Sequence, residues 1–151
     1  MTRPPFAEFS SLAIRELTAW IGGNALWSGR LSEVLSEHFL PVAEQAGLDL
    51  EQAWEALGEF TGPVYGAALE DLCTRRYDDP PENLVADFLR KPGFRLPPLA
   101  KSYLEALRDS VPGVYEVVAV QPGHGVTIRD LLVGGDPIDV IEVSGSRQIV
   151  Q

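Results

Sequence analysis

The sequence predicts an α+β chain, mainly helical over its first two-thirds and ending in a small antiparallel sheet. Residues 10–110 contain several segments in which apolar residues recur at the spacing of one helix face. Residues 111–151 contain short runs rich in β-branched residues, separated by Pro-Gly and Gly-Gly turns. We expect one compact unit overall: a flexible arm at 1–9, a helical region at 10–110 and an incomplete antiparallel β region at 111–151.

Length and composition are those of an ordinary globular protein. The chain has 151 residues, of which 45% are hydrophobic and 23% charged, enough to bury a core without a metal or disulfide. Its single cysteine, Cys73, cannot form an internal disulfide. The sequence shows neither a secretory signal nor the stretch of about 18 apolar residues that a membrane span needs. These features favour a cytoplasmic protein.

The net charge of −10 is unevenly distributed along the chain. Residues 1–74 carry three Arg and eleven acidic residues, whereas residues 75–110 carry seven Lys or Arg and six acidic residues. Because an acidic surface repels phosphate backbones, direct nucleic-acid binding is disfavoured.

The first two helices are predicted from their caps and apolar stripes. A serine pair at 10–11 should cap a helix that runs to about Ile21. A second helix should begin at Ser28 or Ser32, and Pro41 inside its pattern should kink or break it.

The later helices have clearer signals. Asp49 and Gln52 have the spacing of a capping box for a short third helix. Pro63 stands in the first turn of a fourth helix, where its missing N–H is tolerated. Two more helices are expected at about 82–90 and 98–109, each bounded by prolines and glycine.

The β region is predicted in register from its first turn. Pro122-Gly123 has the composition of a type II turn between two strands. Centring the hairpin there predicts three cross-strand pairs, two apolar and one ionic: Val117–Ile128, Ala119–Val126 and Glu116–Arg129. A turn at Gly134-Gly135 should then lead to a third strand beginning at Ile138.

Groups that could carry chemistry are few. The two histidines, His38 and His124, stand in none of the spacings of metal-binding motifs. No nucleophile elbow is present, and His124 lies in a hairpin turn rather than in a Gly-rich loop that opens a helix. Cys73 lies on an apolar helix stripe, where we expect it to be buried and inert. The sequence predicts no catalytic residue, no metal site and no cofactor.

Six residues are candidates for contacts with other molecules. We place Trp27 in a loop and expect it to be a surface anchor for a partner, whereas Trp20 and Trp54 fall on helix stripes and are predicted to be core. The other candidates form the only basic cluster: Arg90, Lys91, Phe94, Arg95 and Lys101. An aromatic ring among cations can stack on a base, but we expect these charges rather to neutralise the acidic helices of residues 1–74.

A string of short motifs runs through residues 88–147: Tyr103-Leu-Glu-Ala-Leu-Arg-Asp-Ser110, Val114-Tyr-Glu-Val117, Pro122-Gly123, Arg129-Asp-Leu131 and Gly134-Gly135. It resembles a family of uncharacterised bacterial proteins, and similar segments occur in some SEC-C motif-containing proteins. In that family the pattern continues into a WDxIAARV strand, which here would begin just after Gln151. The SEC-C cysteines are absent. The resemblance implies a chain truncated at its C-terminus and carries over no activity or zinc site.

Three functional hypotheses follow. The first is a cytoplasmic, non-enzymatic interaction or accessory module that binds a protein partner, or a second copy of itself, through an open sheet edge or the Trp27 region. The second is a nucleic-acid-associated protein that uses the basic segment 90–101, which salt-dependent binding would reveal. The third, a hydrolase-like enzyme, requires His124 to meet a carboxylate and a nucleophile in a pocket.

Overall fold

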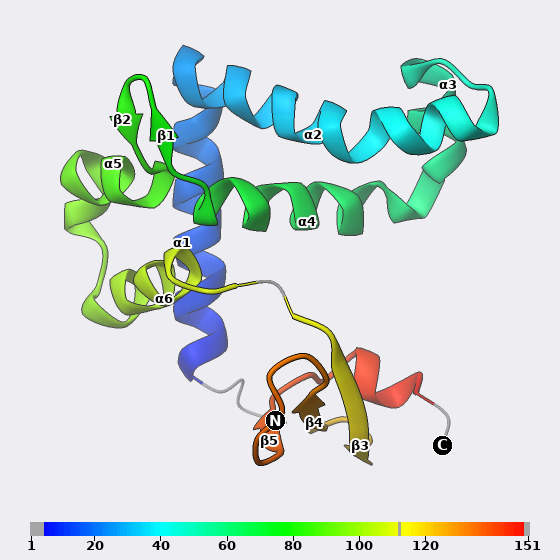
Figure 1. Ribbon diagram of the computed structural model, residues 1–151. Coiled ribbons are helices and arrows are strands. Elements are labelled where there is room, and N and C mark those ends of the chain that lie inside the picture. The colour runs from blue at the N-terminus through cyan, green and yellow to red at the C-terminus, as the bar shows by residue number, and fades with distance from the viewer. Residues whose placement is uncertain (1–4, 112, 150–151) are drawn as a thin grey trace. The chain divides into compact units, whose positions relative to one another are not determined.

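The computed structural model describes residues 5–111 and 113–149, which form an α+β structure (Figure 1). The chain divides into two compact units, Met1–Ser110 and Val111–Gln151. The first is helical apart from a small hairpin, and the second contains a three-stranded antiparallel sheet. The predicted fold class is confirmed.

Helices make up most of the described part of the first unit. Its elements in chain order are α1 (Pro5–Gly22), α2 (Ala25–Ala46), α3 (Leu50–Leu57), the 3-10 turn η1 (Gly58–Phe60), α4 (Thr61–Thr74), β1 (Tyr77–Asp78), β2 (Pro81–Glu82), α5 (Leu84–Arg90), the 3-10 turn η2 (Pro92–Arg95) and α6 (Pro98–Arg108).

The first helix begins earlier than its serines indicate. α1 already includes Pro5, so residues 5–9 are helical and are not part of a flexible arm. Ser10 and Ser11 lie inside the helix rather than at its cap. Proline is tolerated in a first turn because its missing N–H has no intrahelical acceptor there. The remainder of the expected arm, residues 1–4, lies outside the described residues.

The second helix also begins earlier, and it continues through its proline. The side chain of Asn24 caps α2 by accepting a hydrogen bond from the backbone N–H of Trp27 at 3.3 Å. The helix passes Pro41 without a break and ends at Ala46, where it is capped by Gly47, whose φ of 68° is left-handed. The predicted start at a later serine is wrong because asparagine already supplies the cap. The break does not occur, and packing of one face against the core can maintain a helix past a poor residue.

The third and fourth helices have the predicted start signals. Asp49 Oδ1 accepts a hydrogen bond from the Gln52 N–H at 2.8 Å, and the Gln52 side chain accepts one from the Asp49 N–H at 3.1 Å. α4 begins at Thr61, with Pro63 in its first turn. The chain thereby reverses, and α4 runs beside α2 while α3 lies at their ends away from α1 (Figure 1).

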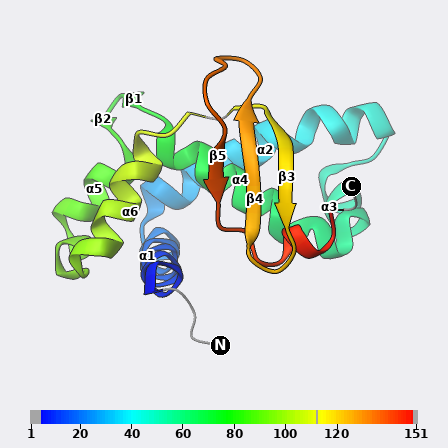
Figure 2. The same ribbon diagram turned by 90° about the horizontal axis from the view of Figure 1, so that it is seen from below.

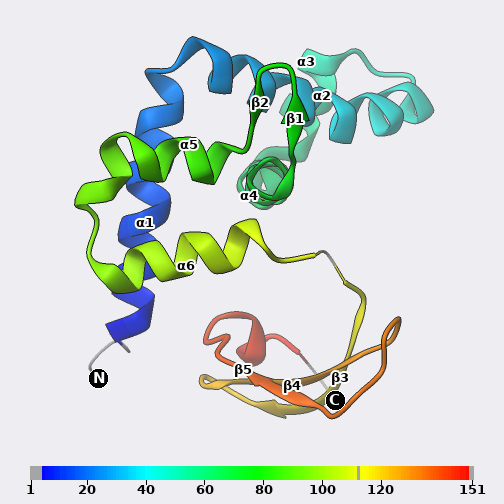
Figure 3. The same cartoon turned by 60° about the vertical axis from the view of Figure 1, so that its left-hand side comes forward.

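A small hairpin that the sequence pattern does not indicate follows α4 (Figure 3). The predicted break at 78–81 is present, but its flanking residues pair as β1 and β2, with Tyr77 opposite Glu82. α5 therefore begins at Leu84 rather than at residue 82.

Buried Asn83 joins the end of α4 to the start of α5. Its side-chain carbonyl accepts a hydrogen bond from the Ala86 N–H at 3.1 Å and so caps α5. Its amide nitrogen donates to the carbonyls of Cys73 and Arg75, each at 2.8 Å. One side chain thus satisfies orphan groups at two helix ends, which a helix otherwise leaves unpaired.

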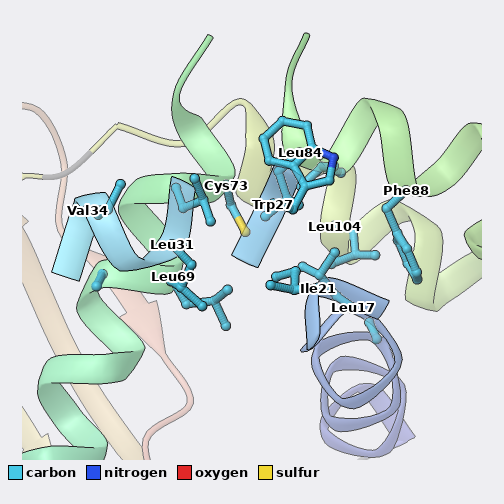
Figure 4. Close-up of a cluster of buried hydrophobic side chains, with 14 of the residues drawn as sticks. Leu17, Ile21, Trp27, Leu31, Val34, Leu69, Cys73, Leu84, Phe88 and Leu104 are labelled. Atoms are coloured by element: carbon cyan, nitrogen blue, oxygen red, sulfur yellow. The ribbon is translucent and has the colours of Figure 1, made fainter. Parts of the chain in front are cut away.

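One cluster of apolar side chains forms the core of the helical unit, with contributions from α1, α2, α4, α5 and α6 (Figure 4). Its largest fully buried members are Trp27, Phe88, Leu17, Leu72, Leu84 and Leu104. A second, smaller cluster joins α2 to α3 and consists of Phe39, Ala43 and Ala53.

Trp27 belongs to this core, and its predicted exposure is wrong. It lies in the first turn of α2 and is 0% exposed. Its indole Nε1–H donates to Asp87 Oδ2 on α5 at 2.9 Å. Lys91 forms an ion pair with the same buried carboxylate at 2.8 Å. Because a buried carboxylate needs donors, Trp27 is a structural residue rather than an anchor for a partner.

Arg30 connects α2 to the hairpin. Its guanidinium is buried, with its central carbon 4.7 Å from the ring centroid of Trp27 and 3.8 Å from that of Tyr77. One terminal nitrogen donates to the backbone carbonyl of Asp79 at 3.2 Å. The weakly hydrated, planar cation suits this position between aromatic rings.

The second unit contains β3 (Tyr115–Gln121), β4 (Gly125–Asp130), β5 (Ile138–Val140) and the 3-10 turn η3 (Gly145–Arg147). The strands pair in the order β3-β4-β5, all antiparallel (Figure 2). Two of the three predicted cross-strand pairs are present: Val117–Ile128 and Glu116–Arg129. The second of these is also an ion pair at 3.6 Å.

The third predicted pair is wrong because β3 contains an irregularity. The register shifts between Val117 and Ala119, so Ala119 lies opposite Thr127 and Val120 opposite Val126. An extra residue in one strand shifts every later partner by one position. No hydrophobic side chain described in 111 and 113–149 is buried, so this unit has little core of its own.

We predict that Trp27→Phe destabilises the protein by about 2 kcal/mol, because the ring is largely kept while a hydrogen bond to a buried charge is lost. Urea unfolding followed by far-UV circular dichroism measures the change. Trp20→Phe is the matched control, since Trp20 is half-buried and packs on Phe88 at a centroid distance of 5.4 Å. Equal losses for the two variants would contradict a special role for the indole N–H of Trp27.

Asp87 should make stability depend on pH in the acidic range. Burial by itself raises the pKa of Asp87, but hydrogen bonds from Lys91 and Trp27 outweigh it and hold the pKa below the ordinary value of 3.8. As pH falls, the unfolded chain takes up this proton first. The stabilisation is therefore complete above the ordinary pKa and is lost as pH falls through the folded-state pKa.

Unfolding free energies measured across this range should fall toward acid, and Asp87→Asn should make the fall shallower. Some slope should remain, because the hydrogen bond from Arg75 also lowers the pKa of Asp71. Asp78→Asn, at an exposed position, should keep the wild-type slope. A wild-type slope in Asp87→Asn would refute the role of this carboxylate.

Candidate functional site

An open groove of about 570 Å³ lies between α2 and α3. Each helix contributes residues from two successive turns of one face: Ser32, Leu35, Ser36 and Phe39 from α2, and Leu50, Glu51, Trp54 and Glu55 from α3. The four α2 positions span about 10 Å of helix at 1.5 Å per residue. We call this feature the α2–α3 groove.

The short α3 is held in place by its cap and by two contacts with α2. The capping box fixes its first turn. Ala53 packs in the small cluster with Phe39 and Ala43. The ring centroids of Phe39 and Trp54 are 4.8 Å apart with a tilt of 45°. The groove therefore has an aromatic base in which Phe39 is buried and Trp54 is not.

Trp54 is the partly exposed aromatic that the sequence analysis assigned to the core. It is 37% exposed, and Leu50, one turn earlier, is 44% exposed. Their stripe was predicted correctly as a helix face, but α3 has only eight residues and packs mainly on α2. The apolar stripe is wider than the surface that covers it. The two tryptophans thus exchange their expected roles, with Trp27 in the core and Trp54 at the surface.

The polar groups that line the groove are mostly acceptors. The hydroxyl of Ser32 donates to the Ser28 carbonyl at 3.0 Å, and that of Ser36 donates to the Ser32 carbonyl at 2.9 Å. Both serines thus direct their O–H groups to their own helix. Glu51 and Glu55 are exposed and form no ion pair with any described residue. Apart from the indole N–H of Trp54, the free polar groups of the groove are therefore carboxylates.

The charge around the groove has one sign. Residues 31–70 contain eight acidic residues and no Lys or Arg. Arg75, just beyond this segment, pairs with Glu37 and Asp71 at 2.7 Å each. His38 lies 3.0 Å from the same Asp71 carboxylate. Arg30, just before this segment, is buried and donates to the Asp79 carbonyl. The arginines that flank the segment are thus engaged with groups that do not line the groove.

Two of the four cations in the predicted basic cluster form ion pairs with acidic residues of the same chain. Arg90 pairs with Glu82 and Asp87, and Lys91 pairs with Asp87. The acidic partners were expected among residues 1–74. They lie instead in the β2–α5 segment. Their proximity follows from the hairpin and the first turn of α5, which the sequence pattern does not reveal.

The other members of that cluster lie on different elements. Phe94, in η2, is 58% exposed, and the Arg95 guanidinium lies 5.4 Å from its ring centroid. Lys101 is half-buried in α6. Neither Arg95 nor Lys101 forms an ion pair with a described residue. Of the proposed nucleic-acid surface, Arg95 beside the exposed Phe94 ring and Lys101 on a separate helix thus remain without a carboxylate partner among the described residues.

The groups considered for catalysis are not brought together. His124 is exposed in the β3–β4 turn. The small cleft of about 170 Å³ beside it is lined by one carboxylate, that of Asp139, and by no hydroxyl or thiol. Asp139 in turn accepts a hydrogen bond from Thr127 at 2.7 Å. Within the described residues, no three His, Cys, Asp or Glu side chains are placed to hold a metal ion.

Comparison with known protein families, with curated proteins and with solved structures finds no match for this chain. Among the described helices, none combines the length and the apolar character that crossing a bilayer requires.

Cys73 is completely buried, as predicted, and burial raises the pKa of its thiol to about 12. We predict that a thiol-specific disulfide reagent does not react with the native protein at mildly alkaline pH and reacts with one thiol per chain in guanidinium chloride. The absorbance of the thiolate released from the reagent measures the extent of reaction under both conditions. Rapid stoichiometric reaction of the native protein would contradict the buried position.

Proposed function

We propose that this protein is a cytoplasmic, non-enzymatic interaction module and that the α2–α3 groove is its contact surface for a protein partner. One observation supports this proposal above the others: Trp54 and Leu50 are exposed in a concave, mainly apolar groove. Tryptophan is enriched among the residues that dominate binding energy at interfaces, because it removes a large apolar area from water on contact.

Other exposed apolar side chains stand on the elements that form or adjoin the groove. Leu40 and Val42 on α2, Leu48 before α3 and Phe60 in η1 are exposed by 41%, 63%, 37% and 62%. Single exposed apolar residues need no explanation, but several around one apolar groove are typical of an interaction site.

The alternatives have less support. A partner could instead pair with β3 or β5, the two edge strands of the described sheet, and this remains a second contact proposal for the same class of function. Nucleic-acid association through residues 90–101 is weakened because Arg90 and Lys91 already pair with carboxylates.

The first test is the replacement of Trp54 by alanine. A partner captured from cell extract by the wild-type protein should be purified and titrated against each variant by calorimetry. Trp54→Ala should weaken binding at least about thirtyfold, the effect of losing an interface residue worth about 2 kcal/mol. Leu99→Ala is the control, because Leu99 on α6 is more exposed than Trp54 and does not line the groove.

Equal affinity of the wild type and Trp54→Ala for the purified partner would refute the groove as the contact surface. If binding were instead lost when Val117→Lys introduces a charge on edge strand β3, the sheet edge would be the contact surface. Circular dichroism of each variant separates lost contacts from lost folding.

A further inference from the structure

We infer that the α2–α3 groove receives a cationic amphipathic helix, with apolar residues on the face toward the groove and Lys or Arg at its border. This inference rests on the proposed function and names the chemistry of the partner. It follows from the charge of the groove, from its hydrogen-bonding capacity and from the shape of its walls.

Charge selects the sign of the partner. Glu51 and Glu55 line the groove one turn apart on α3, and both are exposed. The surrounding segment 31–70 adds further acidic residues and contains no Lys or Arg. An acidic partner would meet like charges at close range, whereas a basic one is attracted and correctly oriented before contact.

Hydrogen bonding leads to the same conclusion. The serine hydroxyls in the groove donate to carbonyls of α2, so the lining offers few free donors. When ionised, the carboxylates of Glu51 and Glu55 can accept hydrogen bonds but cannot donate them. A bound segment must therefore bring the donors. Lysine and arginine do so while their aliphatic stems cover apolar surface such as Leu50 and Trp54.

The walls select a helical conformation for the bound segment. Both walls of the groove are helices. Helical backbone groups lie along the helix axis and are mostly paired within the helix, and the unpaired N–H groups of the first α3 turn are too few to form a row. The groove therefore offers no row of free N–H and C=O groups to an extended peptide, in contrast to a sheet edge. A helix satisfies its own backbone and presents anchors at i, i+3, i+4 and i+7 to an apolar groove.

The experiment uses two synthetic helical probes that carry the same leucine face. One bears lysine on its polar face and the other glutamate, and each carries a fluorescent label. Anisotropy titrations with the full chain should show 1:1 binding of the lysine probe that weakens as salt is added, and binding of the glutamate probe at least tenfold weaker. Trp54→Ala should weaken binding of the lysine probe at least tenfold.

Charge variants test whether the groove carboxylates matter. Glu51→Gln/Glu55→Gln should weaken the lysine probe about fivefold to tenfold, the range expected for two partly screened ion pairs. The matched control is Glu44→Gln/Glu59→Gln, which removes the same charge from exposed carboxylates outside the lining. Its effect should be less than twofold, because Glu44 and Glu59 do not line the groove, although the overall charge of the chain changes by the same amount.

The outcomes separate this inference from the proposed function. Equal binding of both probes with a strong loss in Trp54→Ala would overturn the cationic partner and leave the groove as an apolar contact surface. Lysine-probe binding that is indifferent to Trp54→Ala would overturn both proposals. Concentration-dependent dimerisation in sedimentation that Trp54→Ala abolishes would assign the groove to a second copy of this chain and overturn the foreign helix.

Discussion

The hydrogen bond between the indole of Trp27 and the carboxylate of Asp87 is the constraint on which the helical unit depends. A carboxylate that is 3% exposed is costly to bury unless donors surround it. Trp27 and Lys91 supply those donors, and each requires a definite position of its backbone. The start of α2 and the whole of α5 are thereby held together, with the hairpin between α4 and α5 kept in place by Arg30 and Asn83.

Most buried side chains of the helical unit lie where α2 begins and α5 contacts it. Few therefore cover the other end of α2, next to α3. The main core draws on α1, α2, α4, α5 and α6, while the outer part of α2 has only α3 and the start of α4 beside it and only the three-residue cluster of Phe39, Ala43 and Ala53 beneath it. The eight-residue α3 and the adjoining parts of α2 and α4 do not cover all the apolar side chains of their own stripes. Trp54 and Leu50 therefore stay exposed, and the acidic residues beside them keep this end of the protein charged. The groove is the result of incomplete coverage combined with uniform charge.

Prediction from the sequence succeeded for several local signals, although not for the serine caps at 10–11 or the break at Pro41. The capping box at Asp49, Pro63 in a first turn and the Pro122-Gly123 turn involve neighbours within four residues, so their structure follows from backbone chemistry. It failed where partners are distant in sequence. Trp27 and Asp87 are sixty positions apart, and nothing near Trp27 shows that a carboxylate will meet its indole. Asn24, a good capping residue three positions before Trp27, was the available signal that Trp27 belongs to a helix rather than to a loop.

The sequence by itself determined the α+β class, the order of most elements, the turn chemistry and the excess of acidic residues over 31–70, because each of these is a local or compositional property. Only the tertiary structure decided which apolar stripe is covered and which remains open. Burial depends on whether another element lies opposite, and the stripes of Trp27 and Trp54 cannot be distinguished on that point by their own residues. Coverage placed the first in the core and left the second in the groove, so the candidate site is a property of the packing and not of the motif.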